Sequence, residues 1–474
     1  MTNRGDSGHA RLLVAIASFG NKNLTFLKQI IATYRDMTIK ADVVVLSEAP
    51  KDLGPGVEVV VGLPAKNPWS LPFAHKAIFA KRIDHYDLFA YSEDDIEITE
   101  ANIQAFLHAT PQLEQEEIAG FLRYEIDAAG ARALPDVLGG CHWKAESVRR
   151  RGGYTIAEFT NEHAAFYLLT RSQLKRAIAS GGFLREPYEG RYDMLCSAAT
   201  DPYTSCGFRK VICVSALDEF LIHHMSNRYV GEVGLPLASF KEQVKTLGEI
   251  LEGIHPASTL GNVEPKVLQR IWSKGYYEKP SRELLRAVPE EAKTILSVGC
   301  GWGAVEVELE QRGAQVTAVP LDSVIGAAAA RRGLSVIYGT WGKCLRVLGE
   351  RRFDSVLITR LLHLQPNPAQ ALEQYSRLVR KHGTLVLSGP NFERIPIWFK
   401  RFFGNGDYRR LHSFDVSGIS VCGPRILARH LKEAGLRMTA VQWINHAMPG
   451  KRLAGAQLRL GRLTAQDWIL QARR

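Results

Sequence analysis

The feature that most constrains this chain is an apolar strand that runs directly into three closely spaced glycines. The strand is predicted at Thr294–Val298, the glycines are Gly299, Gly301 and Gly303, and a helix is predicted from Ala304 to Arg312. Glycine lets the backbone turn tightly and approach a ligand without a Cβ in the way. The helix that follows offers free N–H groups and a positive dipole end. The pattern therefore predicts a βα unit whose turn binds the anionic group of a ligand.

The glycine turn alone is compatible with more than one ligand. Gly299, Gly301 and Ala304 also satisfy the dinucleotide pattern G-x-G-x-x-G/A, which would make the domain a nicotinamide-dependent oxidoreductase. A tight βα turn that binds no ligand is another interpretation. Segments further along the chain narrow the choice. They are a strand at 353–358, a loop at 361–366, and a turn with a strand at 382–391.

Taken in order, these segments resemble the class I S-adenosylmethionine-dependent methyltransferases. Residues 411–414 and a helix at 424–434 resemble the late, substrate-side region of that family. The resemblance implies a Rossmann-like, doubly wound α/β methyltransferase domain over residues 281–474, with S-adenosylmethionine as its cofactor. It assigns cofactor binding to residues at the ends of the first two strands, namely Ser297, Gly299, Cys300, Gly301, Gly303 and Asp322.

The chain departs from this family at the second strand. The family usually has an acidic residue there that accepts hydrogen bonds from the ribose hydroxyls, and here Pro320 stands in its place. Asp322, two residues later, is either its replacement or the N-cap of the next helix. Ser297 and Thr340 also stand where many members carry acidic residues. The glycine turn is therefore a firmer part of the predicted cofactor site than the ribose contact.

Two histidines are candidates for a general base in the predicted methyltransferase domain. Methyl transfer depends mainly on alignment of the reacting groups, but an oxygen nucleophile still benefits from a base. His363 lies on the loop that the resemblance places beside the cofactor, and His412 is a second candidate. A structural role is the alternative for both.

The N-terminal part has its own chemical signature at the end of a strand. The apolar segment 86–91 leads into Glu93, Asp94 and Asp95. Three carboxylates at a strand end can hold a hard divalent cation, which can neutralise a diphosphate leaving group. The alternative is a solvated loop leading to a helix at 101–109, with Thr99 as its N-cap.

The surroundings of this acidic element resemble the nucleotide-sugar glycosyltransferases with the GT-A fold. They comprise a strand at 12–17 with a helix at 23–34, a helix at 71–83 and the segment 164–171. The resemblance implies a nucleotide-sugar donor and Mn²⁺ or Mg²⁺. The implied metal ligands are Glu93, Asp94, Asp95 and a later histidine, His224 or its neighbour His223, and the implied catalytic bases are Glu189 and Asp193. The histidine pair could instead be structural, and the two base candidates could be solvated loop carboxylates.

Length and charge support two units. A chain of 474 residues is long for one core, and we predict an N-terminal domain at 1–235, a helical linker at 236–280 and a C-terminal domain at 281–474. Residues 281–474 carry 29 Lys and Arg against 15 Asp and Glu, whereas residues 1–280 carry 31 against 34. A basic half beside a near-neutral half indicates separately functioning units, although the excess charge can also serve solubility alone.

Compartment is predicted from what the sequence lacks. Residues 1–11 are polar without the apolar core of a secretory signal, and no apolar stretch approaches the roughly 20 residues that span a bilayer. Seven scattered cysteines form no C-x-x-C pair, which indicates reduced thiols in the cytoplasm.

Residues 394–410 interleave aromatic and basic side chains, as in a substrate lid, a membrane-surface contact or a helix packed on the sheet.

These observations predict a bifunctional glycan-modifying enzyme. One domain would transfer a sugar from a nucleotide sugar to a glycan or glycolipid, and the other would methylate a hydroxyl. A methyltransferase with a non-catalytic glycan-binding module is the alternative. We expect a cytoplasmic protein that can associate with the inner face of a membrane and has no nucleic-acid partner; the oligomeric state is not predicted.

Overall fold

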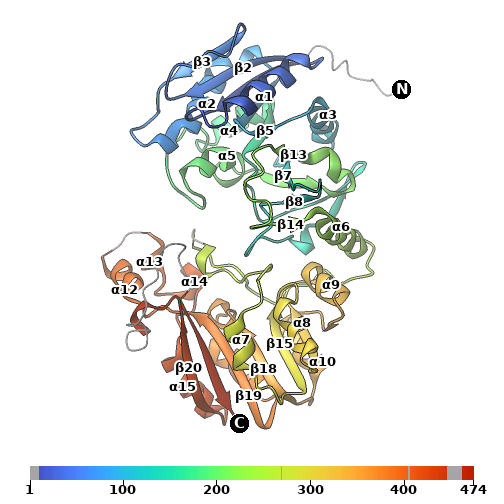
Figure 1. Ribbon diagram of the computed structural model, residues 1–474, viewed down its shortest axis with the longest axis vertical. Coiled ribbons are helices and arrows are strands. Elements are labelled where there is room, and N and C mark those ends of the chain that lie inside the picture. Colours follow the sequence, from blue (N-terminus) through green and yellow to red (C-terminus); the bar gives the residue numbers. More distant parts are fainter. Residues whose placement is uncertain (1–9, 268–269, 404–405, 446–461) are drawn as a thin grey trace. The chain divides into compact units, whose positions relative to one another are not determined.

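The chain folds into two compact units, Met1–Leu251 and Glu252–Arg474, in the computed structural model (Figure 1). The structure describes residues 10–267, 270–403, 406–445 and 462–474, so most of the polar N-terminal segment lies outside the described residues. The division falls inside the segment predicted as a linker. Helix α6 (Leu237–Leu251) belongs to the first unit, where Phe240 packs against Trp143 and Phe159. Residues 252–280 belong to the second.

The first unit is built around a five-stranded sheet in the order β11-β4-β1-β2-β3. Strand β1 pairs in parallel with β2 and β4, and β11 pairs antiparallel with β4. A four-stranded sheet and a second five-stranded sheet complete the unit. The main sheet comprises β1 (Arg11–Ala17), β2 (Lys40–Ser47), β3 (Val57–Val61), β4 (Leu88–Glu93) and β11 (Phe166–Thr170); the smaller sheets comprise β5 (Ile96–Glu97), β6 (Glu117–Ala119), β7 (Leu122–Ile126), β8 (Arg132–Leu134), β9 (Arg149–Arg151), β10 (Tyr154–Ala157), β12 (Arg209–Cys213), β13 (Leu221–His224) and β14 (Leu235–Pro236). The helices are α1 (Leu24–Asp36), α2 (Ala74–Arg82), α3 (Glu100–Ala109), α4 (Arg171–Ala179), α5 (Met194–Thr204) and α6.

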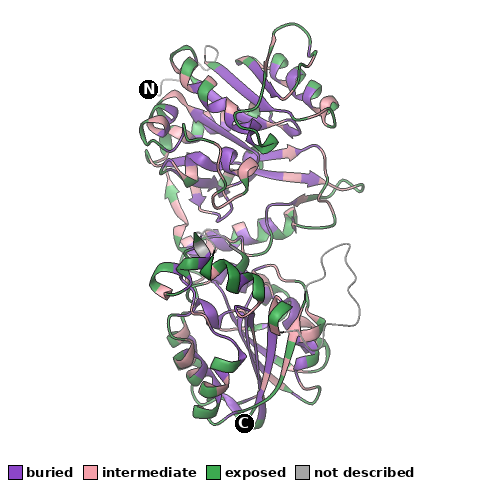
Figure 2. Ribbon diagram, turned by 90° about the vertical axis from the view of Figure 1, so that its left-hand side faces the viewer, coloured by how far each residue is buried: buried purple, intermediate pink, exposed green. Residues whose placement is uncertain are grey.

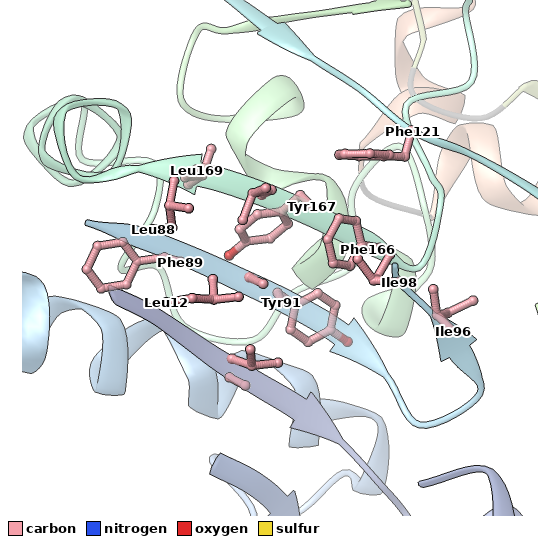
Figure 3. Close-up of a cluster of buried hydrophobic side chains, with 14 of the residues drawn as sticks. Leu12, Leu88, Phe89, Tyr91, Ile96, Ile98, Phe121, Phe166, Tyr167 and Leu169 are labelled. Carbon is pink, nitrogen blue, oxygen red and sulfur yellow. The ribbon is translucent and has the colours of Figure 1, made fainter. Parts of the chain in front are cut away.

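Burial explains why β1 and β4 read as continuous apolar runs. A parallel strand covered on both faces has no solvated side and therefore needs no polar alternation. Figure 3 shows Leu12 of β1, Phe89 and Tyr91 of β4, and Phe166 and Tyr167 of β11 in one hydrophobic cluster. Because β1 and β4 are parallel, their carboxyl ends meet at one edge of the sheet.

The second unit contains a seven-stranded sheet in the order β17-β16-β15-β18-β19-β21-β20. Its first five strands are parallel, and β21 lies antiparallel between β19 and β20. The strands are β15 (Thr294–Cys300), β16 (Gln315–Pro320), β17 (Ser335–Val336), β18 (Phe353–Thr359), β19 (Val379–Pro390), β20 (Arg437–Ile444) and β21 (Asp467–Arg473). The helices are α7 (Arg282–Ala287), α8 (Ala304–Gln311), α9 (Ser323–Arg331), α10 (Trp341–Leu348), α11 (Pro368–Ser376), α12 (Ile395–Phe402), α13 (Asp407–Arg410), α14 (Phe414–Ser417) and α15 (Pro424–Glu433).

This order makes unit 2 a doubly wound α/β domain, as predicted. The chain runs from β15 outward to β17 and then returns to β18 on the other side of β15. In such sheets ligands bind outside the carboxyl ends of the strands at the point where the order reverses. That point lies between β15 and β18. Figure 2 shows the sheet strands largely buried, and helices that alternate buried and exposed faces.

One local prediction is also met. Thr99 caps α3 by accepting a hydrogen bond from the backbone N–H of Asn102. All seven cysteines are free thiols. Among the residues that the structure describes, no helix is both long enough and apolar enough to cross a membrane. The finer GT-A assignment of unit 1 stays a prediction.

Candidate cofactor and acceptor sites

The glycine turn has the backbone that its sequence predicts. Gly299 and Gly303 have φ angles of +80° and +84°, in the left-handed region that favours glycine. A Cβ on Gly301 would lie 2.2 Å from the carbonyl oxygen of Tyr276, and one on Gly299 would lie 2.6 Å from Leu361 Cδ2. The turn is therefore packed closely by the chain itself: backbone packing requires glycine at 301, and the positive φ angles favour glycine at 299 and 303.

The chain closes over this turn with a segment that we call the cover, residues 258–267 and 270–278. The N–H of Trp302, within the glycine turn, donates to the carbonyl of Tyr276 at 3.0 Å. Further along the edge, the N–H of Leu260 donates to the carbonyl of Leu321 at 2.8 Å, and the N–H of Trp341 donates to the carbonyl of Leu260 at 3.2 Å. The cover thus lies across the ends of β15 and β16 and the start of α10.

Asp322, which was expected to contact the ribose, instead interacts with other groups of the protein. Its side chain accepts a hydrogen bond from the N–H of Ile325 at 2.8 Å and so caps α9. It also interacts with the hydroxyl of Tyr276 in the cover, and burial together with this carboxylate raises the pKa of that phenol well above its usual range. Asp322 is only 2% exposed. Ribose hydroxyls would have to share Asp322 with these two partners.

The other residues assigned to the cofactor lie around the turn in different orientations. Ser297 is buried, and its hydroxyl donates to Glu306 Oε1 at 2.6 Å, so it supports α8 from within the domain. Cys300 is buried, and its thiol donates to the carbonyl of Gly301 at 3.4 Å. Thr340 caps α10 by accepting from the N–H of Lys343. The backbone of the turn, rather than these side chains, is what the structure offers to a ligand.

His363, the predicted base, is a buried and neutral imidazole. It is 1% exposed, and its Nε2 donates to the carbonyl of Trp272 at 2.7 Å. Burial lowers its pKa to about 3, with the backbone hydrogen bond opposing. Its Nδ1 is buried without a hydrogen-bond partner. His363 lies behind Trp272 and outside the residues that line the neighbouring cavity, and the second candidate, His412, is exposed and bonds the carbonyl of Arg409.

A cavity of about 860 Å³ opens at the same edge of the sheet. One side is formed by the end of the cover and the start of α7. The other side is formed by the carboxyl ends of β18 and β19 and by the start of β21, which pairs with β19. The start of α12 forms part of the wall. The charged residues that line it were not singled out from the sequence: Glu278, Lys279, Glu283, Arg360, Arg394 and Asp467. No motif links them, because they come from segments up to about 190 residues apart that only the fold brings together.

Ion pairs order the walls of this cavity. Asp467 pairs with Arg360, a residue held at a φ of +49° directly after β18. Lys274, whose side chain is 1% exposed, donates to Glu278 Oε2 at 2.8 Å and to Thr359 Oγ1 at 3.1 Å. The carbonyl of Glu278 in turn accepts from the indole N–H of Trp302 at 2.7 Å. Glu278 is therefore a cavity carboxylate tied directly to the glycine turn.

In unit 1 the acidic element lies at the carboxyl end of β4, beside the end of β1. The side-chain amide of Asn23 donates to Asp94 Oδ1 at 2.8 Å and to Asp95 Oδ2 at 3.4 Å. His224 lies with Nε2 3.2 Å from Asp95 Oδ2 and Nδ1 2.6 Å from Glu125 Oε1. Two of the four predicted metal ligands, Asp95 and His224, are thus in contact.

The other two predicted ligands have different surroundings. Burial raises the pKa of Glu93 to about 7, and the guanidinium of Arg123 opposes that rise. Arg123 itself forms a buried bidentate pair with Asp136, at 2.6 and 2.8 Å. Burial also raises the pKa of Asp94. Within the described ranges, no three His, Cys, Asp or Glu side chains are grouped so that they could hold a metal ion, so the metal site stays a prediction.

The predicted bases of unit 1 both lie at the protein surface. Glu189 is exposed on a loop, and Asp193 is exposed and caps α5 by accepting from the N–H of Cys196 at 2.8 Å. Asp193 and Glu93 both raise the pKa of the Cys196 thiol, after the larger effect of burial. This shared effect on Cys196 places Asp193 near the acidic element, whereas no contact among the described residues places Glu189 there.

Comparison with known proteins decides the identity of the second unit. Residues 272–441 match the family model described as a methyltransferase domain. Unit 2 contains a methyltransferase domain. The match begins at Trp272, so Tyr276 and Glu278 of the cover lie inside it, whereas Leu260 does not.

Two curated relatives are methyltransferases as well. The ubiquinone biosynthesis O-methyltransferase of Alkalilimnicola ehrlichii is 30% identical over 106 residues, which are 21% of this chain and 43% of that protein. The ribosomal RNA small subunit methyltransferase C of Chromohalobacter salexigens is 32% identical over 149 residues, 28% of this chain and 44% of that protein. The chain spans less than half the length of either relative. A SAM-dependent methyltransferase structure from Archaeoglobus fulgidus aligns with 41% of this chain and 95% of its own at 15% identity, with a TM-score of 0.31.

We predict that Gly301→Ala destabilises the methyltransferase domain. The new methyl group would collide with the backbone carbonyl of Tyr276, which cannot move without displacing the cover. We expect a loss of about 2 kcal/mol or more in the free energy of unfolding, measured by urea titration. Gly342→Ala in α10 is the matched control, because no atom lies closer than 3.8 Å to its added Cβ, and it should leave the stability unchanged or slightly raised. Equal stability of both variants would contradict the close packing.

A second prediction concerns the pH dependence that His363 contributes. Its pKa is lower in the folded state, so the unfolded chain binds more protons between about pH 3 and 6.5, and stability is lost as pH falls through that window. His363→Gln keeps a donor for the carbonyl of Trp272 but does not titrate. Between pH 7 and pH 5 the parent should lose about 2 kcal/mol more than the variant. Hydrogen exchange of the β18 amides measures the stability of the parent and of the variant. An equal loss in the two proteins would refute a buried, neutral His363.

Proposed function

We propose that unit 2 transfers a methyl group from S-adenosylmethionine to a hydroxyl of an acceptor bound in the 860 Å³ cavity. The observation that carries the proposal is the glycine turn at the switch point of a doubly wound sheet, inside residues that match a methyltransferase domain. The relatives named as O-methyltransferases support oxygen as the methylated atom. A nicotinamide cofactor remains the rival that binding measurements distinguish.

The residues of the turn fit such a cofactor, but Asp322 already interacts with other groups of the protein. The backbone of Gly299, Gly301 and Gly303 and the first N–H groups of α8 would hold its carboxylate end. Asp322 would accept the ribose hydroxyls only by sharing or giving up its hydrogen bond from Ile325 and its interaction with Tyr276. The cofactor supplies an electrophilic methyl group on a sulfonium, so the task left to the chain is to align the acceptor and remove its proton.

We propose Glu278 as the general base that removes the proton of the acceptor hydroxyl. It lines the cavity, its backbone is tied to Trp302 in the glycine turn, and its carboxylate is oriented by Lys274. A base within reach of both sites can take a proton as the new bond forms. His363 was predicted for this role, but it is buried outside the cavity lining and serves better as a support for Trp272.

Transfer of labelled methyl groups tests this assignment. We predict that Glu278→Gln lowers the turnover rate by about 10²–10⁴-fold, because the amide cannot accept the proton, while cofactor affinity changes little. The exposed Glu350, on the loop after α10, provides the control Glu350→Gln, which should retain the parent rate. A Glu278→Gln enzyme with parental turnover would remove Glu278 from the mechanism.

We propose sugar transfer from a nucleotide sugar as the function of unit 1. The specific observation in its favour is that Asn23 donates to both Asp94 and Asp95 near the adjoining ends of β1 and β4, and that His224 contacts Asp95. Ser18, at the end of β1, is buried and accepts a hydrogen bond from Lys51 Nζ at 2.9 Å, so a cation also lies at this edge. A divalent cation on the carboxylates would neutralise the diphosphate of the donor.

Binding of nucleoside diphosphates with Mn²⁺ tests the proposal for unit 1. We predict that Asp95→Asn weakens Mn²⁺-dependent binding of UDP or GDP at least tenfold in calorimetry, because the site loses a charged ligand. Asp84→Asn is the control, since Asp84 is exposed and pairs only at the surface with Lys175. If the parent binds glycans but no nucleoside diphosphate, unit 1 is a non-catalytic glycan-binding module.

A further inference from the structure

Helix α12 presents an apolar face to solvent. Its large side chains recur at the spacing of one helical face and are exposed by 44, 49, 51, 60 and 74% for Ile395, Trp398, Phe399, Phe402 and Phe403. We call these five residues the aromatic patch. In an ordinary surface helix this face would pack on the core, whereas here the buried residue of the helix is Ile397. An exposed cluster of this kind marks an interaction site.

The rings of the aromatic patch are already organised in the free protein. Trp398 and Phe402 have ring centroids 5.0 Å apart, and those of Phe399 and Phe403 are 5.9 Å apart. Aromatic side chains have few rotatable bonds and lose little rotamer freedom on binding, and here they already contact one another. The patch is therefore a preformed apolar surface.

Basic residues surround the aromatic patch. Residues 394–410 contain five Lys or Arg and one acidic residue, Asp407. Lys400 on α12 and Arg409 on α13 are exposed, and the ammonium of Lys400 lies 4.7 Å from the centroid of the Tyr408 ring. The positive charges thus lie beside the apolar face on the same pair of helices, within a unit that is basic as a whole.

This combination selects one kind of occupant. Trp and Phe side chains enter the boundary between head groups and acyl chains, and flanking Lys and Arg bind anionic head groups. An apolar protein partner would use the rings but not the surrounding charge, and a polyanion would use the charge but leave the rings in water. We propose that the face formed by α12 and α13 docks on the surface of an anionic lipid bilayer.

The position of α12 in the fold gives this docking a structural consequence. Ile397 on the opposite side of the helix, and Arg394 just before it, line the 860 Å³ cavity. One short helix therefore separates the cavity from the aromatic patch. A bilayer bound at the patch would lie next to the cavity wall, whichever acceptor the cavity takes.

Vesicle flotation with the full-length chain tests the proposal directly. We expect the protein to float with vesicles of phosphatidylcholine containing about 30% phosphatidylglycerol at least tenfold more tightly than with phosphatidylcholine alone, and to be released by high salt. The double variant Trp398→Ala/Phe402→Ala should lose at least tenfold of that binding. Lys400→Glu should also weaken it, by more than the roughly fivefold that one neutralised charge would give.

Val347→Ala is the matched control, because Val347 is an apolar residue of α10 that is 58% exposed and lies outside the patch. It should bind like the parent. Absence of vesicle binding by the parent overturns the proposal, as does binding that the patch variant leaves unchanged. Self-association of the parent that the patch variant abolishes, without vesicle binding, would show that a second copy covers the patch. The assay uses neither cofactor nor acceptor, so its result is independent of the proposed methyl transfer.

Discussion

The close approach of two backbone segments at Gly301 is the constraint on which the second unit depends. The carbonyl of Tyr276 lies where a Cβ would be, and the same oxygen accepts the N–H of Trp302 at 3.0 Å. Only glycine permits this contact. It holds the cover on the carboxyl edge of the sheet, and the cover then brings Glu278 to the cavity and Tyr276 to Asp322. Gly301, which the sequence assigned to a ligand, is thus also required for packing.

Much of this fold was predictable because its signals are local. An apolar strand followed by glycines and a helix defines β15 and α8, and the buried runs of β1 and β4 exclude an alternating, half-solvated sheet. The cavity was not predictable for the opposite reason. Arg360 and Asp467 are 107 residues apart and meet only because β21 inserts beside β19. His363 shows the same limit, since a loop position in sequence gave no sign that the ring would be buried behind Trp272.

In both units the residues proposed for chemistry lie at the carboxyl ends of parallel strands, but their surroundings differ. In unit 1, burial alone would raise the pKa of the Asp95 carboxyl, but His224, Ser226 and the charge of Arg123 together lower it. In unit 2 the carboxylate of Asp322 is already occupied by an N-cap and a phenol. A ribose contact at Asp322 would therefore compete with these internal interactions.

We expect the glycine turn of unit 2 to bind S-adenosylmethionine. Calorimetric titration of the full-length chain with S-adenosylmethionine, and in parallel with NAD, measures this without needing the acceptor. We predict one molecule of S-adenosylmethionine bound per chain and no heat of binding from NAD. Binding of NAD instead, or of neither compound, would contradict it.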